Sequence, residues 1–180
     1  MEDHQALSVL AAYMKDADVL DLKQFEGETT LRRFIAGMLS YYPWWVVRLY
    51  RLREILVRVL GLVRHEAPET LPALGPEDVS FTPGERASFF IVRGGEEERF
   101  WIAETPDDNH LKAYFGVIRE PVDASVNRFR VMTSVYYTHW TGPVYFNLIR
   151  PFHHLVVARM ARYALTYQTL RDCRSKGSEY

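Results

Sequence analysis

Two histidines combine a residue type and a position that could support chemistry inside this protein. His139 shares the strand parity of Val135 and Tyr137, so a regular strand would turn its imidazole to the buried side. His153 stands at the border of an apolar stripe on a predicted helix. A buried imidazole can act as a general acid or base, or simply hydrogen-bond to the backbone. His139 and His153 are therefore the catalytic candidates, with a structural role as the alternative.

Other kinds of reactive site find little support. His153 and His154 project about 100° apart around a helix, so they form no chelate on one face. Acids at a turn are usually solvated, although four residues around one turn could hold a cation: Glu104, Asp107, Asp108 and His110. The sequence has no Gly-x-Ser-x-Gly elbow, and no helix follows Gly94-Gly95 to cradle a phosphate. We expect no metal, no cofactor and no nucleophilic or nucleotide chemistry.

Aromatic residues form 14% of the chain, enough to line an apolar cavity. Such rings supply apolar walls with a few hydroxyl groups for orienting a ligand. The same rings could instead pack into a filled core. The candidate ligand-binding residues are Trp101, Phe115, Tyr137, His139, Tyr145, His153 and Tyr163.

Two consecutive helices are predicted in the first half of the chain. Thr29 or Thr30 can cap a helix over residues 31–39, and Pro43 fits the first turn of a helix over 44–63. The apolar stripe of this second helix comprises Trp45, Leu49, Leu52, Leu56, Val59, Leu60 and Val63, opposite Arg48, Arg51, Glu54 and Arg58. Mixed tryptophan and arginine also suit a protein or membrane surface.

Strands are predicted on both sides of this helix pair. A first strand covers residues 19–25, and after a proline-rich connector over 64–85 the period changes to two. Strands then cover 86–93, 98–105, 110–118 and 128–138, with Gly94-Gly95 as the turn of a hairpin. In the last strand Phe129, Val131, Thr133, Val135 and Tyr137 share the buried face, and Arg128, Arg130 and Ser134 the wet one. The sheet is expected to be antiparallel.

A final helix is predicted from Pro151 to about residue 170, after a short connecting stretch over 144–149. Its buried stripe comprises Phe152, Val156, Met160, Tyr163 and Tyr167, with Ala161, Arg162 and Leu165 turned away. Length and pattern favour one α+β domain over residues 1–170, followed by a polar tail over 171–180.

Bulk properties narrow the environment and the partners. The net charge is −1, so no global field recruits nucleic acid or an acidic membrane, and Glu54 argues against a polybasic anchor. Cys173 is the single cysteine, which fits a reducing compartment. No apolar run reaches the roughly 18–20 residues that span a bilayer, and the acidic N-terminus is unlike a secretory signal. We expect a cytoplasmic protein without a transmembrane segment.

Three segments resemble a bacterial family known as Domain of Unknown Function 2867. They are NHLKAYFGV, YPWWVVRLYRLREILVRVLGL and VMTSVYYTHWTGPVYFNLIRPFHHLVVARMARYA. The family pattern falls on Pro43, Trp45, Val46, Gly142, Tyr145, Pro151, Phe152 and His153. Pro143 stands where the family carries an arginine, so any role of that arginine is not carried over.

The resemblance implies a START-like helix-grip fold, in which a curved antiparallel sheet wraps a long C-terminal helix around a cavity. The order of elements found above agrees with this architecture, whereas the cavity is implied by the resemblance alone. The resulting hypothesis is a protein that binds an apolar or amphipathic small molecule, possible ligands including a lipid. The alternatives are an enzyme with a pocket histidine and an interaction module that uses helix 44–63.

Overall fold

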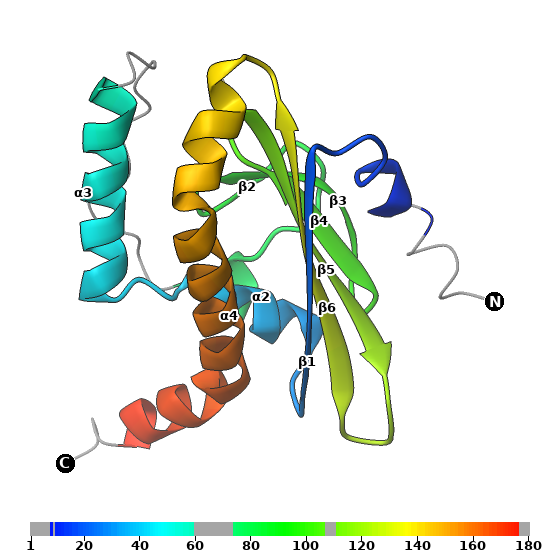
Figure 1. Ribbon diagram of the computed structural model, residues 1–180. Coiled ribbons are helices and arrows are strands. Elements are labelled where there is room, and N and C mark those ends of the chain that lie inside the picture. The colour runs from blue at the N-terminus through cyan, green and yellow to red at the C-terminus, as the bar shows by residue number, and fades with distance from the viewer. Residues whose placement is uncertain (1–7, 9, 60–73, 107–110, 177–180) are drawn as a thin grey trace.

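The computed structural model describes residues 8, 10–59, 74–106 and 111–176 (Figure 1). The elements follow the order β1 (Val19–Gly27), α2 (Leu31–Leu39), α3 (Trp44–Val59), η1 (Pro76–Asp78), β2 (Arg86–Ala87), β3 (Phe90–Glu96), β4 (Phe100–Glu104), β5 (Leu111–Pro121), β6 (Asn127–Tyr137) and α4 (Thr141–Lys176). All strand pairs are antiparallel, and the sheet has the order β1-β6-β5-β4-β3-β2. The predicted α+β class, the antiparallel sheet and the helix pair are confirmed.

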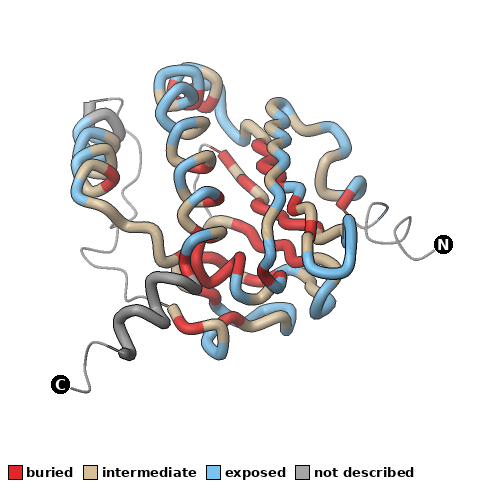
Figure 2. The backbone as a smooth tube through the Cα atoms, turned by 90° about the horizontal axis from the view of Figure 1, so that it is seen from below, coloured by how far each residue is buried: buried red, intermediate tan, exposed pale blue. Residues whose placement is uncertain are grey.

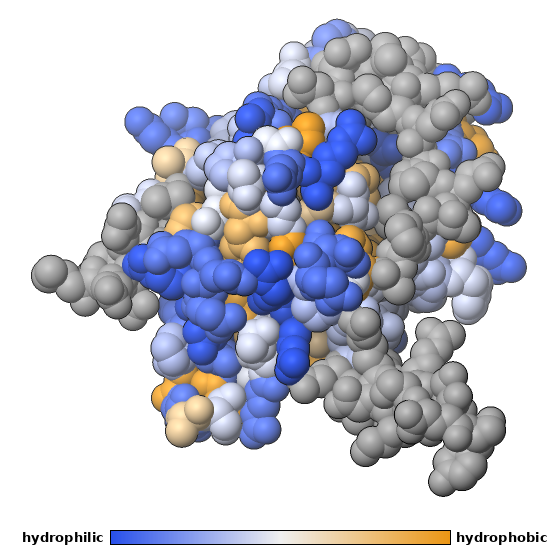
Figure 3. Space-filling view, turned by 180° about the vertical axis from the view of Figure 1, so that it is seen from behind, coloured by the Kyte–Doolittle hydropathy of each residue, from blue (hydrophilic) through white to orange (hydrophobic). Residues whose placement is uncertain are grey.

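The molecule is built in layers on one face of the sheet. Helix α4 and the shorter α2 pack against this face, and α3 lies beyond α4, on the side away from the strands (Figures 1 and 2). The main core lies between the sheet and the two inner helices (Figure 2). Among the described residues, the face seen in Figure 3 is largely hydrophilic, with hydrophobic residues in small groups between hydrophilic ones.

Residues near the N-terminus cover part of the second face of the sheet. Leu10 is buried there against Ile102 and Met132. The Ser134 hydroxyl donates to the backbone carbonyl of Tyr13 at 2.7 Å, and Ser134 is fully buried. The prediction that this face of β6 is wet is therefore wrong at Ser134, because strand parity cannot show that a distant segment folds over the strand.

The hairpin between β3 and β4 turns at another place than predicted. Gly94 and Gly95 lie within β3, beside a register shift, and the chain turns around Glu98, whose φ is 65°. A Cβ atom on Gly95 would stand 2.8 Å from the Phe81 ring atom Cδ1. Gly95 thus serves the close approach of Phe81 rather than the turn.

Helix α4 begins ten residues earlier than predicted. Pro151 lies inside it, so residues 144–149 are helical rather than a connection, and the helix continues through 171–176. Proline removes one hydrogen bond from a helix interior, but burial of Tyr145 and Phe146 in the preceding turns offsets this loss. The buried side of the helix also differs from the predicted stripe: Ala161 is buried and Phe152 is 43% exposed, whereas Tyr163 is half-buried against the core. The predicted inward orientation of Phe152 is wrong.

The buried side of α3 is narrower than its sequence suggests. Val46 is buried, but Leu52 is 53% exposed, which corrects its assignment to the apolar stripe. The inner side is instead partly polar, because the Arg53 Nε donates to the Tyr145 hydroxyl of α4 at 2.5 Å. The side chains of Leu56 and Val59, together with Leu60 and Val63, lie outside the described residues.

Candidate functional site

Two apolar clusters share the interface between the sheet and α4. The larger one surrounds Trp101, Phe34 and Phe129 and includes Val157 and Ala161 of α4. The smaller one lies toward the N-terminal end of α4 and comprises Leu111, Ala113, Val135, Tyr145 and Phe146, with Val19, Tyr137 and Ile149 packed against it. The boundary between these clusters is where polar side chains enter the interface.

Thr133 of β6 and His153 of α4, which we call the polar seam, each stand between residues of the two clusters along their own element. Along β6, Thr133 stands between Val131 of the larger cluster and Val135 of the smaller one. Along α4, His153 stands between residues that contact the smaller and the larger cluster. Thr133 Oγ1 and His153 Nε2 are both buried, and neither finds a hydrogen-bond partner among the described residues. Since most buried polar atoms in proteins are paired, the seam offers two atoms that could bind a polar group.

His153 is held in its neutral form. Burial is the main cause that lowers its pKa to about 4, and the nearby charges of His154 and Lys23 act in the same direction, against the carboxylate of Asp21. Its ring also lies 5.9 Å from that of Phe146. The imidazole is therefore uncharged at neutral pH, with a hydrogen on one of its two nitrogen atoms, and its Nε2 atom is buried.

A second polar group joins the edge strand β1 to α4 beside the seam. Asp21 Oδ2 lies 3.0 Å from His154 Nδ1, and Lys23 contacts both residues, at 3.1 Å from that nitrogen. Burial would raise the pKa of Asp21, but the hydrogen bonds and charges of Lys23 and His154 outweigh it and hold the pKa below its ordinary value. Because Asp21 pairs directly with Thr133 in the sheet register, this group flanks the seam. The pattern of β1 does not indicate this group, because the half-buried face of the strand mixes Val19 and Phe25 with Asp21 and Lys23.

The remaining predicted site residues take different positions. Phe115 and Tyr145 are buried in the interface, Tyr137 packs on the smaller cluster, and Tyr163 lies 5.3 Å from the Tyr41 ring at the junction with α3. His139 is exposed, which corrects its predicted inward orientation. The strand ends at Tyr137, so strand parity no longer applies, and His139 Nδ1 instead lies 2.9 Å from the Thr141 hydroxyl at the start of α4.

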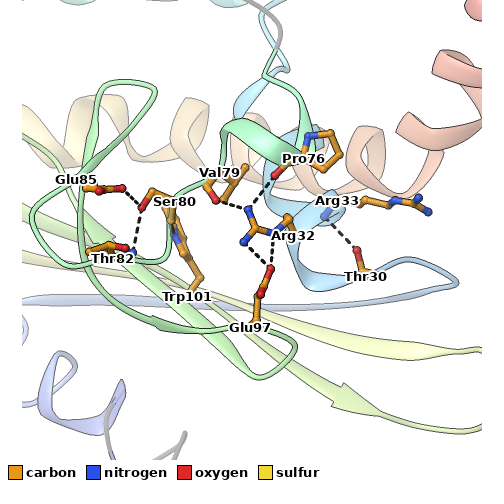
Figure 4. A network of polar contacts seen from close by, with 10 residues as sticks. All are labelled: Thr30, Arg32, Arg33, Pro76, Val79, Ser80, Thr82, Glu85, Glu97 and Trp101. Carbon is orange, nitrogen blue, oxygen red and sulfur yellow. Dashed lines mark hydrogen bonds and ion pairs between the residues drawn. The ribbon is translucent and has the colours of Figure 1, made fainter.

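Trp101 is buried in the larger cluster, and its polar atom already has a partner. The indole Nε1 donates to the backbone carbonyl of Ser80 at 2.9 Å (Figure 4). In the same region Arg32 of α2 donates to the carbonyls of Pro76 and Val79 and pairs with Glu97 (Figure 4). These bonds fix residues 76–80 of the connector against α2 and the hairpin between β3 and β4, so Trp101 is positioned as an apolar wall.

Glu104 is buried rather than solvated at a turn. Its carboxylate pairs with Arg93 at 2.5 Å and lies 3.4 Å from Lys112. The neighbouring candidates Asp107, Asp108 and His110 lie outside the described residues. Within the described part of the chain, no group of three His, Cys, Asp or Glu side chains could hold a metal ion. Glu104 therefore has an ion-pair role on the face of the sheet opposite α4.

The low pKa of His153 predicts a stability that depends on pH. An unfolded histidine titrates near 6.5 and the folded one near 4, so the unfolded state binds more protons in between, and stability falls as the pH drops through this window. Between pH 7 and pH 5 we expect a loss of about 2 kcal/mol in the free energy of unfolding. Urea titrations at both pH values measure it. His153→Gln should remove most of this loss of stability between pH 7 and pH 5. An equal loss in the variant and in the wild type would show that His153 is not the group responsible.

The arrangement of the sheet and the long helix defines the architecture, and the sequence defines the family. A six-stranded antiparallel sheet packed on a long C-terminal helix is a helix-grip arrangement, as the resemblance implies. The chain belongs to the family described as Protein of unknown function (DUF2867), whose model matches residues 10–160. No curated protein matches it.

Solved structures show distant likenesses only. Norcoclaurine synthase from Thalictrum flavum, in complex with dopamine and hydroxybenzaldehyde, is 13% identical, with 83% of this chain and 87% of that chain covered and a TM-score of 0.41. Hypothetical protein jhp0584 from Helicobacter pylori is 10% identical, with coverages of 85% and 89% and a TM-score of 0.42. At these TM-scores neither likeness carries an argument about the site.

Proposed function

We propose that the protein binds an amphipathic small molecule between the sheet and α4, with its polar group at the seam. The observation that carries the proposal is a pair of buried atoms that have no hydrogen-bond partner within the part of the chain that the structure describes, Thr133 Oγ1 and His153 Nε2. Leaving a buried polar group without a hydrogen bond costs about 1–3 kcal/mol. A ligand group that bonds to both atoms would recover part of this cost.

The surroundings of the seam define the chemical class of the ligand. The flanking clusters are apolar and rich in aromatic rings, among them Phe115, Tyr145 and Phe146, which suits a hydrocarbon or ring system. Neutral His153 Nε2 accepts or donates a hydrogen bond according to its tautomer, and the Thr133 hydroxyl does both. A carboxyl, hydroxyl or amide group on an apolar body fits this combination.

Native mass spectrometry of gently purified protein tests the proposal, because a bound ligand adds mass that disappears on denaturation. The fluorescent probe anilinonaphthalene sulfonate then gives an affinity for variants. Thr133→Val keeps the shape of the side chain but removes the hydroxyl, so we expect the affinity to fall by about two- to tenfold, the value of one hydrogen bond.

Thr29 supplies a matched control. Its hydroxyl is also buried and lacks a partner within the described residues. Its backbone, however, bonds to Asn127 at the far end of β6, six residues or about 20 Å along the strand from Thr133. Thr29→Val should leave probe binding unchanged. Absence of added mass together with equal probe binding in both variants would reject the proposal.

The alternative of an enzyme that uses a pocket histidine has weaker support. His139 is exposed, and His153 has a pKa of about 4. A general acid or base works best with a pKa near the operating pH. At neutral pH, His153 is the neutral imidazole rather than the imidazolium that serves as a general acid, and a pKa of about 4 makes it a weak base, so its chemistry favours hydrogen bonding to a ligand.

A further inference from the structure

Positive charge is concentrated in the two long helices. Helix α3 and residues 141–167 of α4 together contain seven arginines and a single acid, Glu54. These segments therefore carry a net charge of +6, and because the whole chain carries −1, the other residues carry −7. The neutral total conceals a strongly basic helical layer and an acidic remainder.

The basic layer also exposes large apolar side chains. On α3, Trp44, Arg48, Arg51 and Ile55 follow one another at intervals of three and four residues, which places them on one face of the helix. Trp44 is 68% exposed, and the Arg48 guanidinium lies 4.6 Å from the centre of its ring. This face is opposite buried Val46, so the packing of α3 does not use it.

Helix α4 continues the same composition on its outer side. Trp140, just before the helix, is 76% exposed. The exposed apolar residues within α4 follow at similar helical spacing and are Val144, Leu148, Phe152 and Leu155. The core instead takes Tyr145, Phe146, Val157 and Ala161 from the other side. Helix α3 and the outer side of α4 thus combine exposed rings, aliphatic side chains and arginines.

We propose that this helical layer binds an anionic lipid surface. Helices that lie in the membrane interface combine arginine or lysine with tryptophan, phenylalanine and leucine, and tryptophan prefers the headgroup region. Anionic lipids attract basic groups within a Debye length of the surface, about 8 Å at physiological salt. At this range the local charge of +6 governs the attraction rather than the charge of the whole chain. This binding is peripheral, since no helix of the described chain is long and apolar enough to cross a membrane.

Co-sedimentation with vesicles tests the lipid surface. We compare vesicles of phosphatidylcholine alone with vesicles of equal parts phosphatidylcholine and phosphatidylserine, and we expect binding to the second kind. Raising the ionic strength from about 0.1 M to about 1 M shortens the Debye length from about 10 Å to about 3 Å, so most of the binding should be lost. The double variant R48E/R51E should lower the partition coefficient by roughly tenfold or more.

Two further variants distinguish a specific role of this face from a general effect of the total charge of the protein. Arg33 on α2 and Arg86 on β2 are exposed and lie outside the layer, so R33E/R86E makes the same change in total charge and should bind almost as well as the wild type. The double variant Trp44→Ser and Trp140→Ser should bind vesicles more weakly than the wild type, but its binding should depend on ionic strength to the same degree. Circular dichroism checks that each variant is folded.

Several outcomes would overturn the proposal. The first is equal binding to vesicles with and without phosphatidylserine. The second is a loss of vesicle binding in R33E/R86E as large as that in R48E/R51E. The third is binding to soluble polyglutamate without binding to vesicles, which would indicate an acidic protein partner. If the protein does not bind vesicles but self-associates, and Trp44→Ser abolishes that self-association, the face is instead a contact with a second copy of the chain. Thr133→Val should not change vesicle binding, so the failure of this proposal and that of the ligand proposal are distinguishable.

Discussion

Phe129→Ala should lower the free energy of unfolding by about 3–5 kcal/mol, the usual cost of truncating a buried phenylalanine. Phe129 of β6 is fully buried, and its ring stacks on that of Phe34 in α2, with centroids 4.2 Å apart and planes at 6°. The variant removes buried apolar area, this ring pair, and the contact that fixes α2 to the centre of the sheet. Urea or thermal unfolding followed by circular dichroism gives the value.

Phe152→Ala is the matched control for this loss. It removes the same side chain from α4, where 43% of the residue is exposed and no buried cluster includes it. We expect a change of less than about 1 kcal/mol, as for most surface substitutions. If the two variants lost equal stability, the orientation of α4 described above would be wrong.

Periodic elements with one clear apolar face were predictable. Helix α2 has the predicted bounds, and the Thr30 side chain accepts from the Arg33 amide at 3.3 Å. The predicted inner face of β6 is also the face that packs toward α4. In both elements the local preference and the tertiary burial agree, which is the condition under which a single sequence is informative.

The errors arose where tertiary packing overrode a local signal. Pro151 is a common first residue of a helix, yet the helix extends through it because Tyr145 and Phe146 gain burial in the turns before it. The predicted stripe also included Phe152, which is 43% exposed, because helical spacing alone does not show which residues of a long helix meet the sheet. Likewise, Gly94 and Gly95 suit a turn, but both lie within β3. There the close approach of Phe81 leaves no room for a Cβ atom at Gly95.

The candidate site was predictable only in part. His153 was named from its position beside an apolar stripe, and the structure buries its Nε2. The other residue of the seam, Thr133, was predicted to be buried, but the absence of a hydrogen-bond partner among the described residues was not predicted, because a pattern of side-chain types contains no information on hydrogen bonds. The same limit applies to Asp21 and His154, which are 133 positions apart in the chain.

Gly37→Val should lower the free energy of unfolding by about 3 kcal/mol, at the upper end of the usual cost of overpacking. A Cβ atom at Gly37 would stand 2.7 Å from Ala164 Cα and 3.0 Å from Tyr167 Cβ. The first of these is a backbone atom of α4, so it moves only if the whole helix moves. The variant should therefore push α4 away from α2, and we expect weaker probe binding at the seam as well as a lower midpoint of urea unfolding.

Two variants separate this helix contact from the general effect of losing a glycine. Gly94→Ala places its Cβ in ordinary contact, 3.7 Å from Ile102, and should leave stability almost unchanged. Gly37→Ala gains about 1 kcal/mol of helix propensity yet should still destabilise the protein. Adding Ala164→Gly to it should restore only part of the loss, because the Cα atom of residue 164 remains in place. Full restoration would mean that side-chain crowding, rather than the approach of the α4 backbone, determines this contact.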